Sequence, residues 1–335
     1  MMSETAKPCS VSQQLIDRAK RVWSAVLHAA ANEKLLVITD DGAAALGAAF
    51  YKGARELGLQ VVHVIIPPCL DGASDVAVLG ELVFRKCDVY VAITSAGTRS
   101  VTHSRARQEA SRAGARGLTL PSMTEEMLLR DSVGADYEVI GHGAEALANA
   151  LNGTDGLRIT SEGGTDLMLD VHGGTWFAER GLCDRPGDFS NLPGGEVSIA
   201  PVDAEGTLVV DGSINCLGRL ESPLEITIKN RRIVSIKGKN SEKLTSFLEG
   251  FGPDAFNIAE IGIGMNPMAQ LCGTVLEDEK ILGTIHIGIG DNSHMGGKSL
   301  GEVVAADVHI DGVVISNPKI CADGSVIEPR DFIDS

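Results

Sequence analysis

Aromatic and basic side chains are scarce in this sequence. Aromatic residues make up 4% of the 335 residues, which leaves few candidates for the stacking platforms that bind single-stranded nucleic acids. The 29 lysines and arginines face 45 aspartates and glutamates, which gives a formal net charge of -16. Because this charge repels phosphate backbones on average, nucleic acid is not an expected partner.

Long hydrophobic runs are missing as well. No stretch approaches the roughly 18 uninterrupted apolar residues of a membrane span, and no apolar run follows Lys7 near the start. The seven cysteines are scattered, odd in number and never spaced as CxxC. This usage favours free, reduced thiols over a disulfide framework or a thiolate zinc site. We therefore expect a cytoplasmic protein without a secretory signal or a membrane-spanning segment.

The first half alternates between helical and extended patterns. The sequence predicts helices at 11–31, 43–57, 76–84, 100–113 and 124–130, and strands at 34–40, 60–67, 87–94 and 117–120. Successive strand-helix-strand units pair their strands in parallel with right-handed crossovers. The pattern therefore predicts a doubly wound α/β domain with a mostly parallel sheet over residues 1–153. This half lacks the patterns GxGxxG and GxxxxGK[ST] that cradle nucleotide phosphates.

The second half has a different pattern and is rich in short strands. Strands are predicted at 157–160, 165–171, 197–201, 208–210, 224–229 and 232–237, with one helix at 241–248. The segment Glu162-Gly163-Gly164 is a hairpin signal between the first two of these strands. We therefore expect a β-rich α+β domain over residues 154–335.

The most informative stretch is His309-Ile310-Asp311. It lies in a predicted strand over 308–314, where side chains at positions i and i+2 point to the same face. His309 and Asp311 can therefore reach one ion together. A neutral imidazole beside a carboxylate suits zinc, manganese, cobalt or iron better than calcium or magnesium.

Three further candidate ligands lie upstream. Glu196 follows a glycine-rich turn, whereas Glu260 and His286 lie inside apolar, glycine-rich runs. An unpaired carboxylate is costly among apolar neighbours, so Glu260 needs a cation or hydrogen-bond donors. Together with His309 and Asp311, these residues predict a metal site in the second half.

Two nearby features are not counted among the candidate metal ligands. The acidic run Glu277-Asp278-Glu279 predicts a solvated turn. His294, in a glycine-rich loop shortly after His286, is a candidate acid, base or substrate contact.

These motifs resemble those of the aminopeptidase T and aminopeptidase S family of two-metal aminopeptidases. The resemblance covers about residues 160 to 315. The matching stretches occur in the family's order at 164–167, 191–197, 260–264, 278–286, 296–298 and 309–311. The resemblance implies two divalent ions, zinc, cobalt or manganese, held by Glu196, Glu260, His286, His309 and Asp311. It also implies a homodimer. The family's catalytic tyrosine has no counterpart, because Ser293 stands in its place. Glu196 and His294 are the predicted catalytic residues.

A second branch resembles this family in fold, namely the ring-cleaving dihydroxypyridine dioxygenases that use one ferrous ion. In that branch a histidine stands at the place of Glu260, and the equivalents of Glu196 and His286 are not ligands. Because both glutamates and His286 are present here, we expect a metallo-aminopeptidase-like hydrolase. It would cleave an amide or N-terminal peptide bond of a small molecule or peptide with metal-activated water. A dioxygenase with Fe(II) and a non-catalytic metal-binding or scaffold protein are the alternatives.

Overall fold

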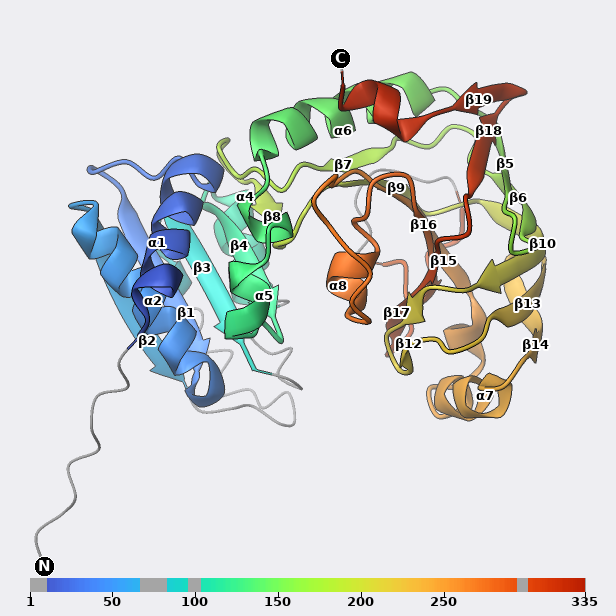
Figure 1. Ribbon diagram of the computed structural model, residues 1–335, viewed down its shortest axis with the longest axis horizontal. Helices are drawn as coiled ribbons and strands as arrows, with labels where there is room; N and C mark the ends of the chain where they lie inside the picture. Colours follow the sequence, from blue (N-terminus) through green and yellow to red (C-terminus); the bar gives the residue numbers. More distant parts are fainter. Residues whose placement is uncertain (1–10, 67–82, 96–103, 294–300, 335) are drawn as a thin grey trace, which may run out of the picture. The chain divides into compact units, whose positions relative to one another are not determined.

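A parallel sheet organises the first part of the chain (Figure 1). The computed structural model describes residues 11–66, 83–95, 104–293 and 301–334. The sheet contains, in spatial order, β2 (Gln60–Ile66), β1 (Lys34–Asp40), β3 (Val89–Thr94), β4 (Arg116–Pro121) and β8 (Phe189–Ser190). Each neighbouring pair is parallel. The central strand β3 is fully buried, as expected for a parallel sheet whose two faces are both covered.

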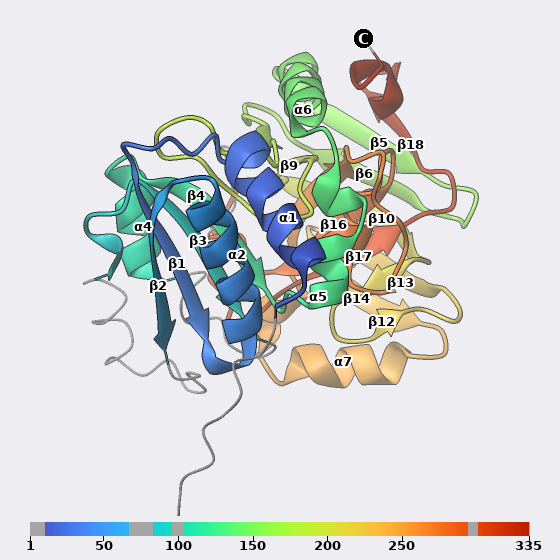
Figure 2. The ribbon, with the colours of Figure 1, turned by 60° about the vertical axis from the view of Figure 1, so that its left-hand side comes forward.

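Helices lie against both faces of this sheet. They are α1 (Gln13–Arg21), continued by a π-helical turn (Val22–Val26), α2 (Ala44–Glu56), α4 (Arg105–Arg112) and α5 (Glu125–Leu129). Figure 2 shows α1 and α2 side by side. Gly47 of α2 lies directly over Thr39 and His63, so α2 covers the odd-numbered face of β1. Ile38 belongs to the opposite face and packs in one cluster with Ala106 of α4. The predicted doubly wound α/β fold is therefore confirmed.

Two antiparallel sheets form the β-rich part. The first runs β14 (Arg232–Lys237), β13 (Leu224–Lys229), β10 (Asp203–Val210), β6 (Asp166–Asp170), β5 (Gly156–Thr160), β18 (Lys319–Ala322) and β19 (Ser325–Ile327). The second runs β12 (Gly218–Arg219), β11 (Ser213–Ile214), β17 (His309–Val314), β16 (Ile285–Gly290), β15 (Ile258–Gly264), β9 (Glu196–Ile199) and β7 (Phe177–Glu179). The helices of this part are α6 (Tyr137–Leu151), α7 (Ser241–Glu249) and α8 (Val275–Asp278).

The observed units divide the chain differently from the predicted boundary after residue 153. The first unit is Met1–Gly134 with Gly181–Leu192, and the second is Ala135–Arg180 with Pro193–Ser335. Helix α6 belongs to the second unit because it packs against β7 and β9. The segment that carries β8 returns to the first unit because β8 pairs with the edge of the parallel sheet at β4. Neither α6 nor β8 is among the elements expected from the sequence.

Other predictions have mixed outcomes. The predicted helix at 76–84 lies almost wholly outside the described residues, as do residues 100–103 of the next one. Among the described residues, Cys87, Cys183, Cys216, Cys272 and Cys321 form no disulfide bond. In the described part of the chain, no helix combines the length and the apolar character needed to cross a bilayer.

The second unit should depend strongly on the isoleucine face of its second sheet. Ile287 of β16 is fully buried, so Ile287→Ala should lower the free energy of unfolding by about 2–5 kcal/mol. Val234→Ala, which truncates a side chain that is 55% exposed, should change it by no more than about 0.5 kcal/mol. Urea denaturation followed by circular dichroism measures both. Equal losses in the two variants would contradict this assignment of the core.

Candidate metal centre

All five predicted ligands lie on one face of the second antiparallel sheet. Four neighbouring strands contribute them, namely β9, β15, β16 and β17. The register pairs Glu196 with Gly264, Glu260 with Gly288, and Gly288 with Asp311, so these side chains share a face. His286 lies opposite Gly262, and His309 lies opposite Gly290. The structure therefore brings together residues that are far apart in the sequence.

Glycines on this face make room for the charged side chains. A Cβ atom on Gly288 would lie 2.6 Å from the Cβ atom of Glu260, 2.9 Å from Cε1 of His309 and 3.2 Å from Oδ1 of Asp311. A Cβ atom on Gly262 would lie 2.0 Å from Nε2 of His286. The glycine-rich runs around Glu260 and His286 thus reflect the space that the neighbouring functional groups occupy.

Glu260, His309 and Asp311 form the most complete group of donor atoms. Nε2 of His309 lies 3.3 Å from Oε2 of Glu260 and 3.3 Å from Oδ1 of Asp311. Atoms that each bind one ion at about 2.0–2.2 Å lie about 3 Å apart when they occupy adjacent positions. The ligand atoms of this group also lie within 4.8 Å of one another. The three residues therefore fit three positions on one face of a single metal ion.

The other nitrogen of His309 fixes the imidazole for this role. Nδ1 of His309 lies 2.6 Å from the carbonyl oxygen of Asp291, which can only accept a hydrogen bond. Nδ1 therefore carries the hydrogen, and in the neutral ring Nε2 directs its lone pair at two carboxylates. This arrangement requires a cation between the three groups or a proton on Nε2.

The charges around His309 favour a positive charge at Nε2, whether it is a metal ion or a proton. Burial lowers the pKa of His309, but the carboxylates of Asp311 and Glu260 outweigh it and raise the pKa well above the usual value. Burial raises the pKa of Asp311, but the positive charge of His309 outweighs this effect and lowers the pKa to about 2. The donor set, two carboxylates and one oriented imidazole, fits a divalent ion of the borderline class such as iron, manganese, cobalt or zinc.

Glu196, Glu260 and His286 form a second group that shares Glu260 with the first. Nε2 of His286 lies 3.3 Å from Oε2 of Glu196 and 4.0 Å from Oε1 of Glu260. The two oxygens of Glu260 thus face different histidines. His286 differs from His309 in one respect, because its buried Nδ1 has no hydrogen-bond partner among the described residues. The second group lacks the partner that usually orients a metal-binding histidine.

The prediction of a solvated turn at Glu277-Asp278-Glu279 was wrong. These side chains are buried, because the short helix α8 packs against β11 and β17. Asp278 accepts hydrogen bonds from the backbone N–H groups of Cys272 and Gly273, at 2.6 and 2.8 Å. An acidic run followed by a lysine has the same local pattern in a solvated turn, so only the tertiary packing distinguishes the two.

Lys280 is a residue of the candidate site to which the sequence patterns assigned no role. Its side chain is 2% exposed, and Nζ lies 2.6 Å from Oε2 of Glu196 and 2.8 Å from Oε1 of Glu279. Burial lowers the pKa of Lys280, but the charges of Glu196 and Glu279 raise it well above its ordinary value. Glu279 forms a further group with His286 and Asp311. Burial raises the pKa of Glu279 to about 7, although Lys280 opposes this shift.

The predicted acid or base His294 lies outside the described residues. Ser293, in the place of the family tyrosine, is described. Its hydroxyl donates to Oδ1 of Asp291 at 2.7 Å, and its backbone N–H donates to the same oxygen. Ser293 is therefore engaged in the turn whose carbonyl group orients His309.

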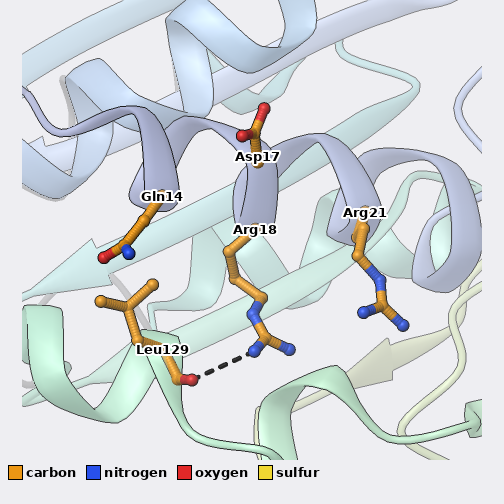
Figure 3. A pocket seen from close by; sticks show the side chains of 5 residues that line it. All are labelled: Gln14, Asp17, Arg18, Arg21 and Leu129. Carbon is orange, nitrogen blue, oxygen red and sulfur yellow. Dashed lines mark hydrogen bonds between the residues drawn. The ribbon is translucent and has the colours of Figure 1, made fainter.

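A hollow in the first unit carries a different set of side chains. It is lined by Gln14, Asp17, Arg18, Arg21 and Leu129 (Figure 3). Arg18 donates to the carbonyl oxygen of Leu129, and Arg21 donates to that of Gly134. These arginines tie α1 to the segment around α5, and the hollow contains none of the candidate ligands.

The α/β unit and the antiparallel sheets together make up a two-domain fold like that of aminopeptidase T. The chain belongs to the 2,5-dihydroxypyridine 5,6-dioxygenase family, whose model matches residues 20–302. No curated protein sequence matches the chain.

Two solved structures resemble the chain over nearly its full length. The 2,5-dihydroxypyridine dioxygenase from Pseudomonas putida has 20% identity and a TM-score of 0.78, and the alignment covers 96% of each chain. AmpT from Thermus thermophilus has 15% identity and a TM-score of 0.66, covering 95% of this chain and 98% of its own. Both resemblances inferred from the motifs are supported, and the family model favours the dioxygenase branch, which the sequence analysis placed second.

The glycine opposite the ligands provides a test of the site. Gly288→Ala should weaken the binding of a divalent ion roughly tenfold to a hundredfold, because the new Cβ atom displaces Glu260 and His309. Gly156→Ala is the matched control, since a Cβ atom there meets nothing closer than 3.8 Å. Calorimetric titration of metal-free protein measures both affinities. An unchanged affinity in Gly288→Ala would place the ion elsewhere.

Proposed function

We propose that this protein is a metal-dependent dioxygenase that opens the ring of a hydroxylated nitrogen heteroaromatic compound. Its single ion would be held by Glu260, His309 and Asp311. The observation that carries the proposal is the oriented His309, whose Nε2 is 3.3 Å from an oxygen of each carboxylate. Three ligands on one face of an ion leave the opposite positions open for substrate and oxygen. The family match supports this reaction class.

The protein residues have defined tasks in such a reaction. Glu260 and Asp311 supply negative charge that retains a divalent ion, and the Asp291 carbonyl group holds His309 in the tautomer that can bind it. A bound ferrous ion supplies the electron-transfer chemistry that allows oxygen to react with an aromatic ring. Both atoms of one oxygen molecule enter the product as one ring bond breaks, so no external reductant is required.

Glu260 is the main departure from the dioxygenase branch, for which the resemblance described above implies a histidine at this place. A carboxylate adds one negative charge to the ligand set and therefore binds a divalent ion more strongly by electrostatic attraction. The proposed site thus has one histidine and two carboxylates. We therefore propose a hydroxylated nitrogen heteroaromatic ring as the substrate class, with 2,5-dihydroxypyridine as the first compound to test.

A two-ion amide hydrolase is the second candidate. It is favoured by Glu260, whose Oε1 faces His286 and whose Oε2 faces His309, as in a carboxylate that bridges two ions. Such ions would activate a water molecule and polarise a scissile carbonyl group. The Lys280 ammonium group, 2.6 Å from Glu196, already neutralises a ligand that the second ion would use. The predicted homodimer remains a prediction under either candidate.

Reconstitution of metal-free protein distinguishes the two candidates. With ferrous iron, the protein should bind one equivalent and consume oxygen in the presence of 2,5-dihydroxypyridine, which can be followed with an oxygen electrode. Asp311→Asn should reduce this rate by more than about a hundredfold, because it weakens a direct ligand. The matched control is Asp166→Asn, which alters an exposed carboxylate that pairs with Arg158.

A different set of results would support the hydrolase. Oxygen-independent hydrolysis of an amino-acyl anilide with two equivalents of zinc, cobalt or manganese would replace the proposal with the hydrolase. Neither activity, with no bound metal, would favour a scaffold protein.

Exchange of Glu260 provides a second test. Glu260→His creates the ligand set of two histidines and one carboxylate found in many non-haem iron oxygenases. We expect this variant to retain one equivalent of iron and to consume oxygen at a rate of the same order. In a two-ion hydrolase, the same change would remove the bridging carboxylate, so metal analysis would then show the loss of an ion together with the loss of anilide hydrolysis.

A further inference from the structure

We propose that the ammonium group of Lys280 takes the place of a second metal ion and thereby keeps this centre at one ion. The inference rests on the proposed one-ion function and explains why Glu196 and His286 are present without a second ion. Removing the ammonium group should expose a latent second metal site formed by Glu196, Glu260 and His286.

The position of Lys280 is the first argument. Nζ lies 2.6 Å from Oε2 of Glu196, and that same oxygen lies 3.3 Å from Nε2 of His286. A second ion would need this oxygen as a ligand, at about 2.1 Å. The ion and the ammonium group would then be no more than about 4.7 Å apart, within the bond lengths that this oxygen allows. Two cations this close repel each other strongly in a buried site.

The charge of the cluster is the second argument. Four carboxylates, Glu196, Glu260, Glu279 and Asp311, gather on this face with Lys280 and two histidines. With all four carboxylates ionised, Lys280 protonated, neutral histidines and one divalent ion, the cluster keeps one negative charge, and a second ion would make it positive. Without Lys280, the same four carboxylates require two divalent ions for neutrality. The lysine therefore shifts the balance against the second ion by one full charge.

The orientation of the histidines is the third argument. His309, in the proposed one-ion site, has its Nδ1 bound to a carbonyl oxygen. Nδ1 of His286 is buried without such a partner among the described residues. Lys280 itself is held on both sides, by Glu196 and Glu279, so it is a fixed part of the site. Of the two groups, only Glu260, His309 and Asp311 thus combine the donor atoms of a metal centre with a hydrogen bond that orients the histidine.

Metal stoichiometry tests the inference directly. Metal-free wild-type protein and Lys280→Met, which keeps most of the side-chain volume, would be titrated with cobalt(II) and analysed by elemental analysis and visible absorption. We expect one equivalent in the wild type and two in Lys280→Met. The double variant Lys280→Met with Glu196→Gln should return to one equivalent, because it loses a ligand of the second ion.

Lys237→Met is the matched control, since it removes an exposed lysine that pairs with Glu225. It should bind one equivalent. A single equivalent in both the wild type and a folded Lys280→Met would overturn the role of Lys280 and leave the proposed function intact. Two equivalents in the wild type would instead overturn the one-ion function.

Glu196→Gln in the wild-type background covers the case in which Lys280→Met does not fold. Because Glu196 is paired with the lysine and is not a ligand of the one-ion site, this variant should still bind one equivalent, with an affinity weakened less than about tenfold by the loss of one nearby negative charge. Loss of the bound equivalent, or an affinity weakened about a hundredfold or more, would show that Glu196 binds the ion, which contradicts the inference.

Discussion

The concentration of negative charge on one buried sheet face is the constraint on which the rest of this structure depends. Glu196, Glu260, Glu279 and Asp311 each lie within a few ångströms of His286, and Glu260 and Asp311 also lie close to His309. Such a cluster is unstable unless cations are present, because buried carboxylates repel one another and have lost their water. Lys280 supplies one fixed positive charge. A divalent ion at the candidate metal centre would offset the remaining deficit, and the glycines opposite the candidate ligands leave the space for it.

Much of this arrangement could be predicted from local sequence patterns. The strand periodicity around His309 and Asp311 placed both side chains on one face, and the structure has them in β17 with that geometry. Glu260 was singled out because a carboxylate inside an apolar, glycine-rich run needs a partner, and it lies in the fully buried strand β15. The alternating pattern of the first half likewise matched the parallel sheet. In each case the signal came from a few consecutive residues.

What the sequence did not reveal depends on distant contacts. The acidic run before Lys280 has no local feature that distinguishes burial from solvation, and its environment comes from β11 and β17. Helix α6 differs, because it carries a local signal, an N-cap at Asp136 and buried residues at helical spacing, and only its assignment to the second unit depends on packing against β7 and β9. Strand β8 was missed because it has only two residues, Phe189–Ser190, and is defined by its pairing with β4. Periodicity cannot identify a two-residue strand.

The course of the chain between the two units has a practical consequence. The backbone passes from one unit to the other three times, after Gly134, after Arg180 and after Leu192. No single truncation therefore releases either unit intact. A fragment ending at residue 153 would carry α6 without the strands that bury its apolar side, and its sheet would end at an unpaired β4 edge. Excision of the β-rich unit for separate expression would need a redesigned connection across residues 181–192.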